Sequence, residues 1–174
     1  MTLILKQIFA LLKVLNSDTG EKQIAAGVAC GLIIGFSPIL SLQTLLVFVL
    51  LFFFRIQIGA AFASAFFFAF CAYLFDPLCH ALGSYVLEME SLKGFFTTLY
   101  NMPIVPFTRF YNSVVMGSGI IAFLMAPFIY LISLVLIKKY RVTVVARIKE
   151  TKFFKALKTT SLFKWYAKYD ELYG

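Results

Sequence analysis

Charged side chains are scarce in this sequence. Asp, Glu, Lys and Arg together make up 14% of the 174 residues, and there is a single His. The chain contains no H-E-x-x-H motif, no nucleophile elbow, no phosphate-binding glycine loop and no motif of paired carboxylates. Because none of the usual catalytic arrangements is present, we do not expect the protein to be an enzyme.

Cysteine is also rare, and its spacing excludes a stapled fold. Cys30, Cys71 and Cys79 are odd in number, lie in apolar segments and show no paired spacing. We therefore expect neither a disulfide framework nor a cysteine metal site, and no other metal or cofactor is predicted. The three side chains are interpreted as small buried hydrophobes.

Apolar residues, in contrast, form long uninterrupted runs. Hydrophobic residues make up 61% of the chain, the mean hydropathy is +0.90, and three apolar blocks cover 24–54, 58–87 and 114–137. A membrane-spanning helix needs about 20 residues, so the third block fits one span, which Pro127 should kink. We predict an all-α, multi-pass integral membrane protein with a single transmembrane domain at 21–137.

The first two blocks are each too long for one ordinary span and too short for two. Each contains a helix breaker, "GFSP" at 35–38 in the first block and "FDP" at 75–77 in the second. We predict that both blocks break into half-helices, as a degenerate repeat, and that the connector 54–59 makes them antiparallel neighbours. Two forms stay open: re-entrant hairpins of the transporter kind, or two kinked and tilted spans.

The two ends of the chain are predicted to be amphipathic helices. In residues 1–20 the apolar side chains share one face, which favours a helix in the membrane interface. Residues 138–174 carry most of the net charge of +8, so the positive-inside rule places this tail in the cytoplasm. We expect it to bind anionic lipid through Lys138, Lys139, Arg141, Lys152, Lys155 and Lys158. Nucleic acid is not expected, because the charge directly follows a transmembrane segment.

The segment 91–112 and the N-terminal charges bear on the topology. Two prolines and several aromatic residues predict an interfacial loop at 91–112, with room for a short helix. Lys6, Lys13 and Lys22 mildly favour a cytoplasmic N-terminus. If both ends are cytoplasmic, one broken block must return to the side from which it starts.

Polar side chains gather at the predicted break of the first block. A helix that begins after Pro38 would present its positive N-terminal end there, which attracts anionic groups such as a lipid phosphate. We predict a lipid headgroup site at Ser37, Pro38, Ser41, Gln43, Thr44 and Asp76. The alternative is that these groups only satisfy loose backbone.

Three ionisable side chains lie at membrane depth: Arg55, Asp76 and His80. Such groups are expected to be paired, hydrated or near a helix end. Arg55 ends the first block and is expected to reach the interface. Asp76 is either the cap of a half-helix that begins at Pro77, or a proton or cation site, or a partner for Arg55. His80 is interpreted as a satisfied polar residue.

Small residues form a helix-packing pattern. Gly27, Gly31 and Gly35 make a double G-x-x-x-G, and Gly59 and Ala63 supply small residues at the same spacing in the second block. We predict a structural seam between the two blocks, in preference to a ligand role.

The run from residue 23 to residue 61 resembles a bacterial membrane family known only as a domain of unknown function, number twenty sixty-two in its series. The shared features are the small-residue run, Gly35 to Pro38, Gln43 with Thr44, Arg55, the residue before Pro77, and Gly83. Gln57 stands where that family often has Asn, and Asp76 replaces a frequent Asn before the proline.

A subgroup with "LYNMPIVPFTRFYNSVVMGS" and a tail beginning "KKYR" is most similar, and the resemblance then covers nearly the whole chain. It implies an inner-membrane protein of bacteria with an outer membrane. It also implies a neighbouring gene for a much larger envelope protein, of the kind that bridges the periplasm and moves lipids. It implies no catalytic residue.

Three functions follow as hypotheses. The first is a component of phospholipid or anionic lipid transport, which passes lipid through the seam between the blocks beside Ser37, Pro38, Gln43 and Asp76. The second is an anchor or assembly subunit whose small-residue faces dock a partner's transmembrane helix. The third is a transporter of small solutes or ions that depends on Asp76.

Overall fold

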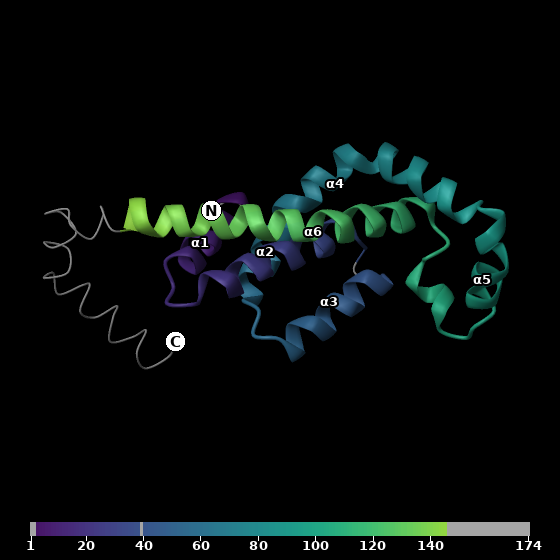
Figure 1. Ribbon diagram of the computed structural model, residues 1–174, viewed down its shortest axis with the longest axis horizontal. Coiled ribbons are helices and arrows are strands. Elements are labelled where there is room, and N and C mark those ends of the chain that lie inside the picture. Colours follow the sequence, from purple (N-terminus) through teal and green to yellow (C-terminus); the bar gives the residue numbers. More distant parts are fainter. Residues whose placement is uncertain (1–2, 39, 146–174) are drawn as a thin grey trace, which may run out of the picture. The chain divides into compact units, whose positions relative to one another are not determined.

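The computed structural model describes residues 3–38 and 40–145, and this part of the chain is built from helices and turns (Figure 1). The prediction of an all-α fold is confirmed for these residues. The chain divides into a unit of residues 1–135 and a unit of residues 136–174. The helices are α1 (Leu3–Leu15), α2 (Glu21–Phe36), α3 (Leu42–Phe53), α4 (Ile58–Leu87), α5 (Glu90–Tyr100), the 3-10 helix η1 (Val105–Thr108), α6 (Ser113–Tyr140) and the π-helical turn η2 (Arg141–Val145).

The first apolar block is broken where the sequence predicts. α2 ends at Phe36, and Ser37 is extended, with φ −113° and ψ 146°. Proline disfavours helical backbone in the residue before it and has no N–H to donate, so Pro38 accounts for this end. The chain turns, and α3 begins at Leu42 with Ser41 as its N-cap.

The second block is not broken, so the predicted break at 75–77 and the predicted repeat are wrong. α4 continues through Pro77 as one helix of 30 residues, which Figure 1 shows as an arch. Proline removes one helical hydrogen bond, but the turns on either side can keep theirs when they are packed. The Phe75 ring lies 6.2 Å from the ring of Phe36 in α2, and Gly83 packs against α6. α6 likewise continues through Pro127.

α2 and the first half of α4 are parallel neighbours, which corrects the prediction of antiparallel blocks. A Cβ on Gly27 would lie 2.5 Å from the carbonyl oxygen of Gln57, and one on Gly35 would lie 3.0 Å from the amide nitrogen of Ala69. At the start of both helices the Gln57 amide donates to the Gln23 carbonyl at 3.2 Å. The reason is that α3 has already returned the chain to the side on which α2 begins.

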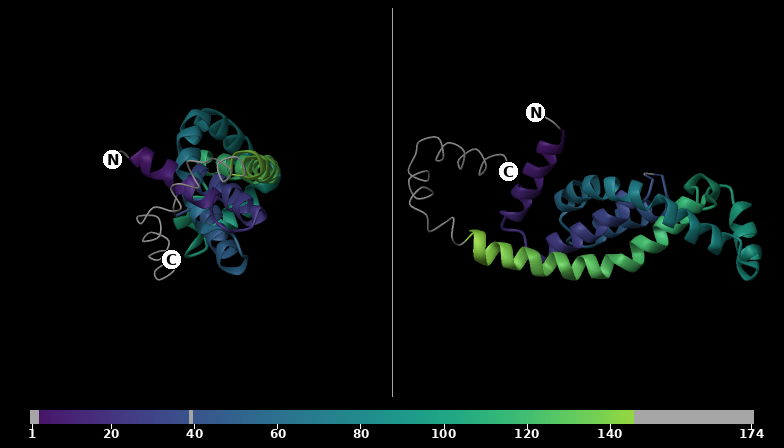
Figure 2. Two further views of the ribbon diagram at one scale, coloured as in Figure 1. Left: turned by 90° about the vertical axis from the view of Figure 1, so that its left-hand side faces the viewer. Right: turned by 90° about the horizontal axis from the view of Figure 1, so that it is seen from above.

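α6 runs against the direction of α4 and crosses it near the start of α6 (Figure 2). At the crossing Gly117 lies against Cys79, and Gly83 lies against Ser113. A buried cluster joins α2, α3, α4 and α6. Its members are Cys30, Leu32, Ile33, Val47, Leu51, Ala61 and Ala122.

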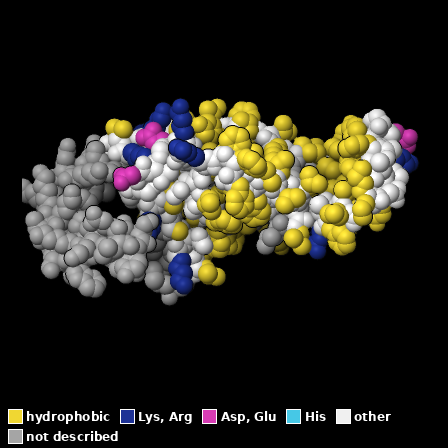
Figure 3. All heavy atoms as spheres, turned by 90° about the horizontal axis from the view of Figure 1, so that it is seen from below, with side chains coloured by type: hydrophobic (Ala, Val, Ile, Leu, Met, Phe, Trp, Pro, Cys, Tyr) yellow, Lys and Arg dark blue, Asp and Glu magenta, His cyan; other side chains and the backbone are white. Residues whose placement is uncertain are grey.

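Among the described residues, two helices, α4 and α6, are long and apolar enough to cross a membrane, as judged by length and composition. Large apolar side chains stay exposed on several elements: Phe52 in α3 is 89% exposed and Tyr73 in α4 is 84% exposed. On the face drawn in Figure 3 hydrophobic side chains gather over the middle, and the coloured charged side chains lie nearer its ends.

The predicted terminal helices are described only in part. α1 lies within the predicted 1–20 segment and packs on α4, with Val14 near Gly59. Lys138 and Lys139 lie in the last turn of α6, and Arg141 begins η2. The rest of the predicted tail, including Lys152, Lys155 and Lys158, lies outside the described residues.

Candidate functional site

The polar side chains at the α2–α3 break bind one another. The Ser41 hydroxyl accepts a hydrogen bond from the Thr44 amide at 3.2 Å and donates to Thr44 Oγ1 at 3.0 Å. The Thr44 hydroxyl in turn donates to the carbonyl oxygen of Pro38 at 3.0 Å. Ser41 and Thr44 are nearly fully buried. Three of the predicted headgroup residues therefore close the break, which is the alternative role considered for them.

Two other polar groups near the break are left with spare hydrogen-bonding capacity. Within the described residues, Ser37 Oγ and Gln43 Oε1 are buried and have no hydrogen-bond partner. The other end of the Gln43 amide is occupied, because Nε2 donates to the Val115 carbonyl at 3.1 Å and rests on Gly119 of α6. Gln43 thus ties the start of α3 to α6, and its Oε1 is a buried acceptor without a partner among the described residues.

The two serines at the break give a matched test of this assignment. Ser41→Ala removes the cap of α3 and should lower the free energy of unfolding by about 1 kcal/mol. Ser37→Ala removes a buried hydroxyl that has no partner among the described residues, so its effect should be close to zero or slightly stabilising. Thermal unfolding of the detergent-solubilised variants measures both. Equal losses would contradict the assignment.

Asp76 does not join this group. It lies inside α4, so it is not the cap of a half-helix. Within the described part of the chain it has neither a hydrogen bond nor an ion pair. Arg55 lies between the end of α3 and the start of α4. The first residue of α4, Ile58, is already about 27 Å from Asp76 along the helix axis, at 1.5 Å per residue. The structure therefore does not bring the two charges together, which removes the pairing as one of the alternatives for Asp76. His80 is satisfied, since Nδ1 lies 2.5 Å from the Ser113 hydroxyl of α6.

An apolar cavity of about 470 Å³ opens beside the start of α3. Its walls come from α3, α5, η1 and α6, and Gln43 is the polar side chain among its described lining residues. The others are Leu42, Leu46, Phe95, Phe96, Leu99, Val105, Phe110, Met116 and Phe123. We call this space the acyl cavity, after the ligand that we propose for it below. Its volume lies in the range of about 300–1,000 Å³ that is usual for small-molecule sites.

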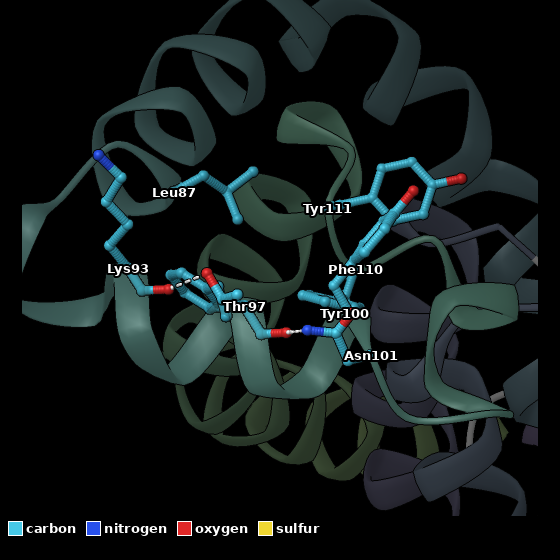
Figure 4. A pocket seen from close by; sticks show the side chains of 8 residues that line it. Leu87, Lys93, Thr97, Tyr100, Asn101, Phe110 and Tyr111 are labelled. Atoms are coloured by element: carbon cyan, nitrogen blue, oxygen red, sulfur yellow. Dashed lines mark hydrogen bonds between the residues drawn. The ribbon is translucent and has the colours of Figure 1, made fainter.

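A second, more open pocket of about 350 Å³ lies on the other side of Phe96 and Phe110, which line both spaces. Figure 4 shows Lys93, Thr97, Tyr100 and Asn101 along α5, with Leu87, Phe110 and Tyr111 facing them. We call this space the polar pocket. Its described lining contains one charged side chain, that of Lys93.

The predicted packing residues lie between helices of the same chain. Gly27, Gly31 and Gly35 face α4, where Ala63 is 2% exposed, and Gly59 faces Val14 of α1. The glycine face of α2 is therefore covered by α4. It does not present the surface that the anchor hypothesis needs for a partner helix.

Apart from Gln43, sequence reasoning missed the residues that form the two cavities. Leu92, Phe96 and Leu99 recur at helical spacing in 90–100, and this amphipathic pattern could have predicted α5 as a lining helix. Gly117 and Gly119 flank Ser118 in α6, and this cluster of small residues could have predicted a close helix contact.

Comparisons with known proteins place the site within a matched region. A family model described as "Uncharacterized protein conserved in bacteria (DUF2062)" matches residues 8–144, which include α2 to α6 and both cavities. An uncharacterized protein of Treponema pallidum (strain Nichols) is 30% identical over 118 residues, which are 68% of this chain and 72% of that protein. No solved structure gives a significant match.

Proposed function

Since the chain belongs to the DUF2062 family of bacterial proteins, as its resemblance indicated, we propose that it is a small multi-pass protein of the inner membrane that takes part in phospholipid or anionic lipid transport. It works with a larger, periplasm-spanning partner that carries a transmembrane helix. The observation that carries the proposal is the acyl cavity, an apolar space beside a helix break with one polar side chain in its described lining.

The helix directions support a simple topology for this protein. α2 enters the membrane, α3 returns, and α4 starts again beside the start of α2, so α2 and α3 form a re-entrant hairpin. α4 then crosses the membrane, and α6 runs in the opposite direction and crosses back. Both ends of the chain are then cytoplasmic, as the positive-inside rule favours, and α5 and η1 lie on the periplasmic side.

The helix break between α2 and α3 supports lipid binding beside it. Irregular backbone at membrane depth is tolerated only where it is buried in protein or lines a cavity. Ser41 and Thr44 satisfy part of this backbone within the chain. Gln43, the next polar residue, lies in the lining of the acyl cavity, but its Oε1 is itself buried and its Nε2 is bonded to Val115. The cavity therefore offers an almost wholly apolar interior, which suits a lipid acyl chain.

Filling the acyl cavity tests the proposal. We expect Met116→Trp, which adds bulk to the cavity wall, to abolish photo-crosslinking of the cavity-lining residues of α5 by a phospholipid that carries a diazirine in one acyl chain, while the bilayer-facing sides of α4 and α6 stay labelled. Met125→Trp is the matched control, because Met125 lies on α6, is 44% exposed and does not line the cavity. Crosslinks to the α5 residues Phe95, Phe96 or Leu99 in wild-type protein report the cavity, because α5 lies outside the hydrocarbon core in the proposed topology.

The outcomes separate a lipid site from loss of the fold. Leu99→Trp narrows the same cavity from α5 and should act like Met116→Trp, while both variants keep the elution profile of the wild type. Undiminished crosslinking in both variants, or equal loss in Met125→Trp, would contradict lipid binding in this cavity.

A further inference from the structure

The acyl cavity and the polar pocket share one wall. Phe96 of α5 and Phe110 line both spaces, and their rings are stacked with centroids 6.2 Å apart. Two aromatic rings therefore separate an apolar space from a polar one. A single molecule that reaches past these two rings would contact both the acyl cavity and the polar pocket.

The two spaces differ sharply in chemistry. The acyl cavity has Gln43 as the polar group of its described lining, whereas the polar pocket has an ammonium, two phenol hydroxyls, a hydroxyl and an amide. Thr97 and Asn101 already donate to carbonyls of α5, at 2.7 Å and 2.9 Å. The ammonium of Lys93 and the hydroxyls of Tyr100 and Tyr111 have no hydrogen-bond partner among the described residues. Figure 4 shows Lys93 at one end of the pocket and the two tyrosine rings at the other, so the ammonium alone is assigned to an anionic group.

Lys93 is only weakly engaged by the protein. Its Nζ lies 4.0 Å from Glu90 Oε1, and the side chains of Lys93 and Glu90 are 75% and 93% exposed. An exposed pair of this kind contributes little, so the ammonium can turn to another anion at small cost. Lysine acts as a point charge with three rotatable donors, which suits a phosphate or carboxylate.

We propose that the two spaces form one site for an anionic amphiphile, whose acyl chain occupies the acyl cavity and whose headgroup binds Lys93. This assignment rests on the proposed function and names its ligand class. A wholly apolar ligand would leave the polar pocket unused, and a free anion would leave the acyl cavity unused. A molecule with both parts uses the linings on both sides of the shared wall of Phe96 and Phe110.

The position of the site agrees with a role in exchange of lipid. Figure 1 shows α5 at the end of the unit where α4 finishes and α6 starts. In the proposed topology this is the periplasmic side. Headgroups of the outer leaflet lie at that level, and a periplasmic partner would approach there.

The test compares two lipids that share one acyl chain. We expect the full-length protein in detergent to bind 1-palmitoyl-lysophosphatidylglycerol, which is anionic, several-fold more tightly than 1-palmitoyl-lysophosphatidylcholine, which carries no net charge. Lys93→Gln should weaken binding of the anionic lipid about two- to fivefold, as for an exposed charge pair, and should remove the preference. Lys22→Gln, which removes an exposed lysine at the start of α2, is the matched control and should change neither value.

Each result decides the proposal. Equal affinity of the wild type for the two lipids, or equal effects of Lys93→Gln and Lys22→Gln, would overturn it. Comparable binding of glycerol phosphate, which has no acyl chain, would also overturn it, because the anion would then bind alone. If Met116→Trp abolishes binding of both lipids while Lys93→Gln changes nothing, the acyl cavity stands and the headgroup assignment fails. If neither variant has an effect, both fail.

Discussion

Gly117→Ala is expected to remove most of the folded protein. A Cβ at this position would overlap the backbone of Cys79 in α4, with the carbonyl carbon only 2.7 Å away and the carbonyl oxygen nearer still. The obstacle is backbone on both sides, because Gly83 lies against Ser113 in the same crossing, so no flexible side chain can move aside. Overpacking usually lowers the free energy of unfolding by about 1–3 kcal/mol. Because this change forces two backbones apart, we expect a loss at or above the upper end of that range.

The change can be measured as the free energy of unfolding in detergent and as the amount of monodisperse protein recovered. Gly94→Ala is the matched control, because a Cβ there would have no described heavy atom within 4 Å and Gly94 lies in helix α5. That variant should be stabilised slightly, by about 0.5–1 kcal/mol, since alanine loses less conformational freedom than glycine in a helix. If the two variants behave alike, the close crossing of α4 and α6 is not present in solution.

Gly31→Ala is expected to separate α2 from α4. The new Cβ would lie 2.5 Å from the carbonyl oxygen of Ala61 and 3.0 Å from the amide nitrogen of Ala65, and it would also meet the hydroxyl of Ser64. The Ser64 hydroxyl cannot easily leave, because it donates to the Ala60 carbonyl at 2.6 Å. We expect a loss of about 2–3 kcal/mol and an opening of the α2–α3 hairpin.

A disulfide assay reports this opening directly. The backbones of Gln23 and Gln57 meet through a hydrogen bond of 3.2 Å, so Gln23→Cys with Gln57→Cys should crosslink readily in the parent chain. Adding Gly31→Ala should slow the crosslinking, and adding Gly20→Ala should not. Gly20 is the suitable control, because a Cβ there would have only the side chain of Gln23 nearby, at 3.9 Å. Unchanged crosslinking with Gly31→Ala would show that the glycine seam does not hold the hairpin.

The break in the first block could be predicted because its cause is local. Pro38 and the residue before it determine where α2 ends, and Ser41 supplies a cap within three residues. The outcome at Pro77 depends on remote contacts instead. α2 on one side and α6 on the other pack against the turns around it, and a single sequence does not show which helices will be neighbours.

The candidate site was predictable only in part for the same reason. Gln43 was recognised as a polar residue beside a break, and the structure places it in the lining of the acyl cavity. Asp76 was assigned to the same site because a second helix break was predicted beside it. α4 is continuous at that position, so the basis for this assignment is lost. Lys93 and Met116 reach the two cavities only because α5 and η1 fold beside α3 and α6, a tertiary arrangement that no local motif encodes.

The parallel packing of α2 on α4 also sets an order of assembly during synthesis. The glycine face of α2 is covered by α4, which the ribosome synthesises only after α3. The Gln23 carbonyl likewise receives its hydrogen bond from the Gln57 amide only after that residue has been synthesised. Until α4 is synthesised, no helix of this chain covers the glycine face of α2. We therefore expect nascent chains that end before residue 58 to be degraded faster by proteases than chains that include the first half of α4.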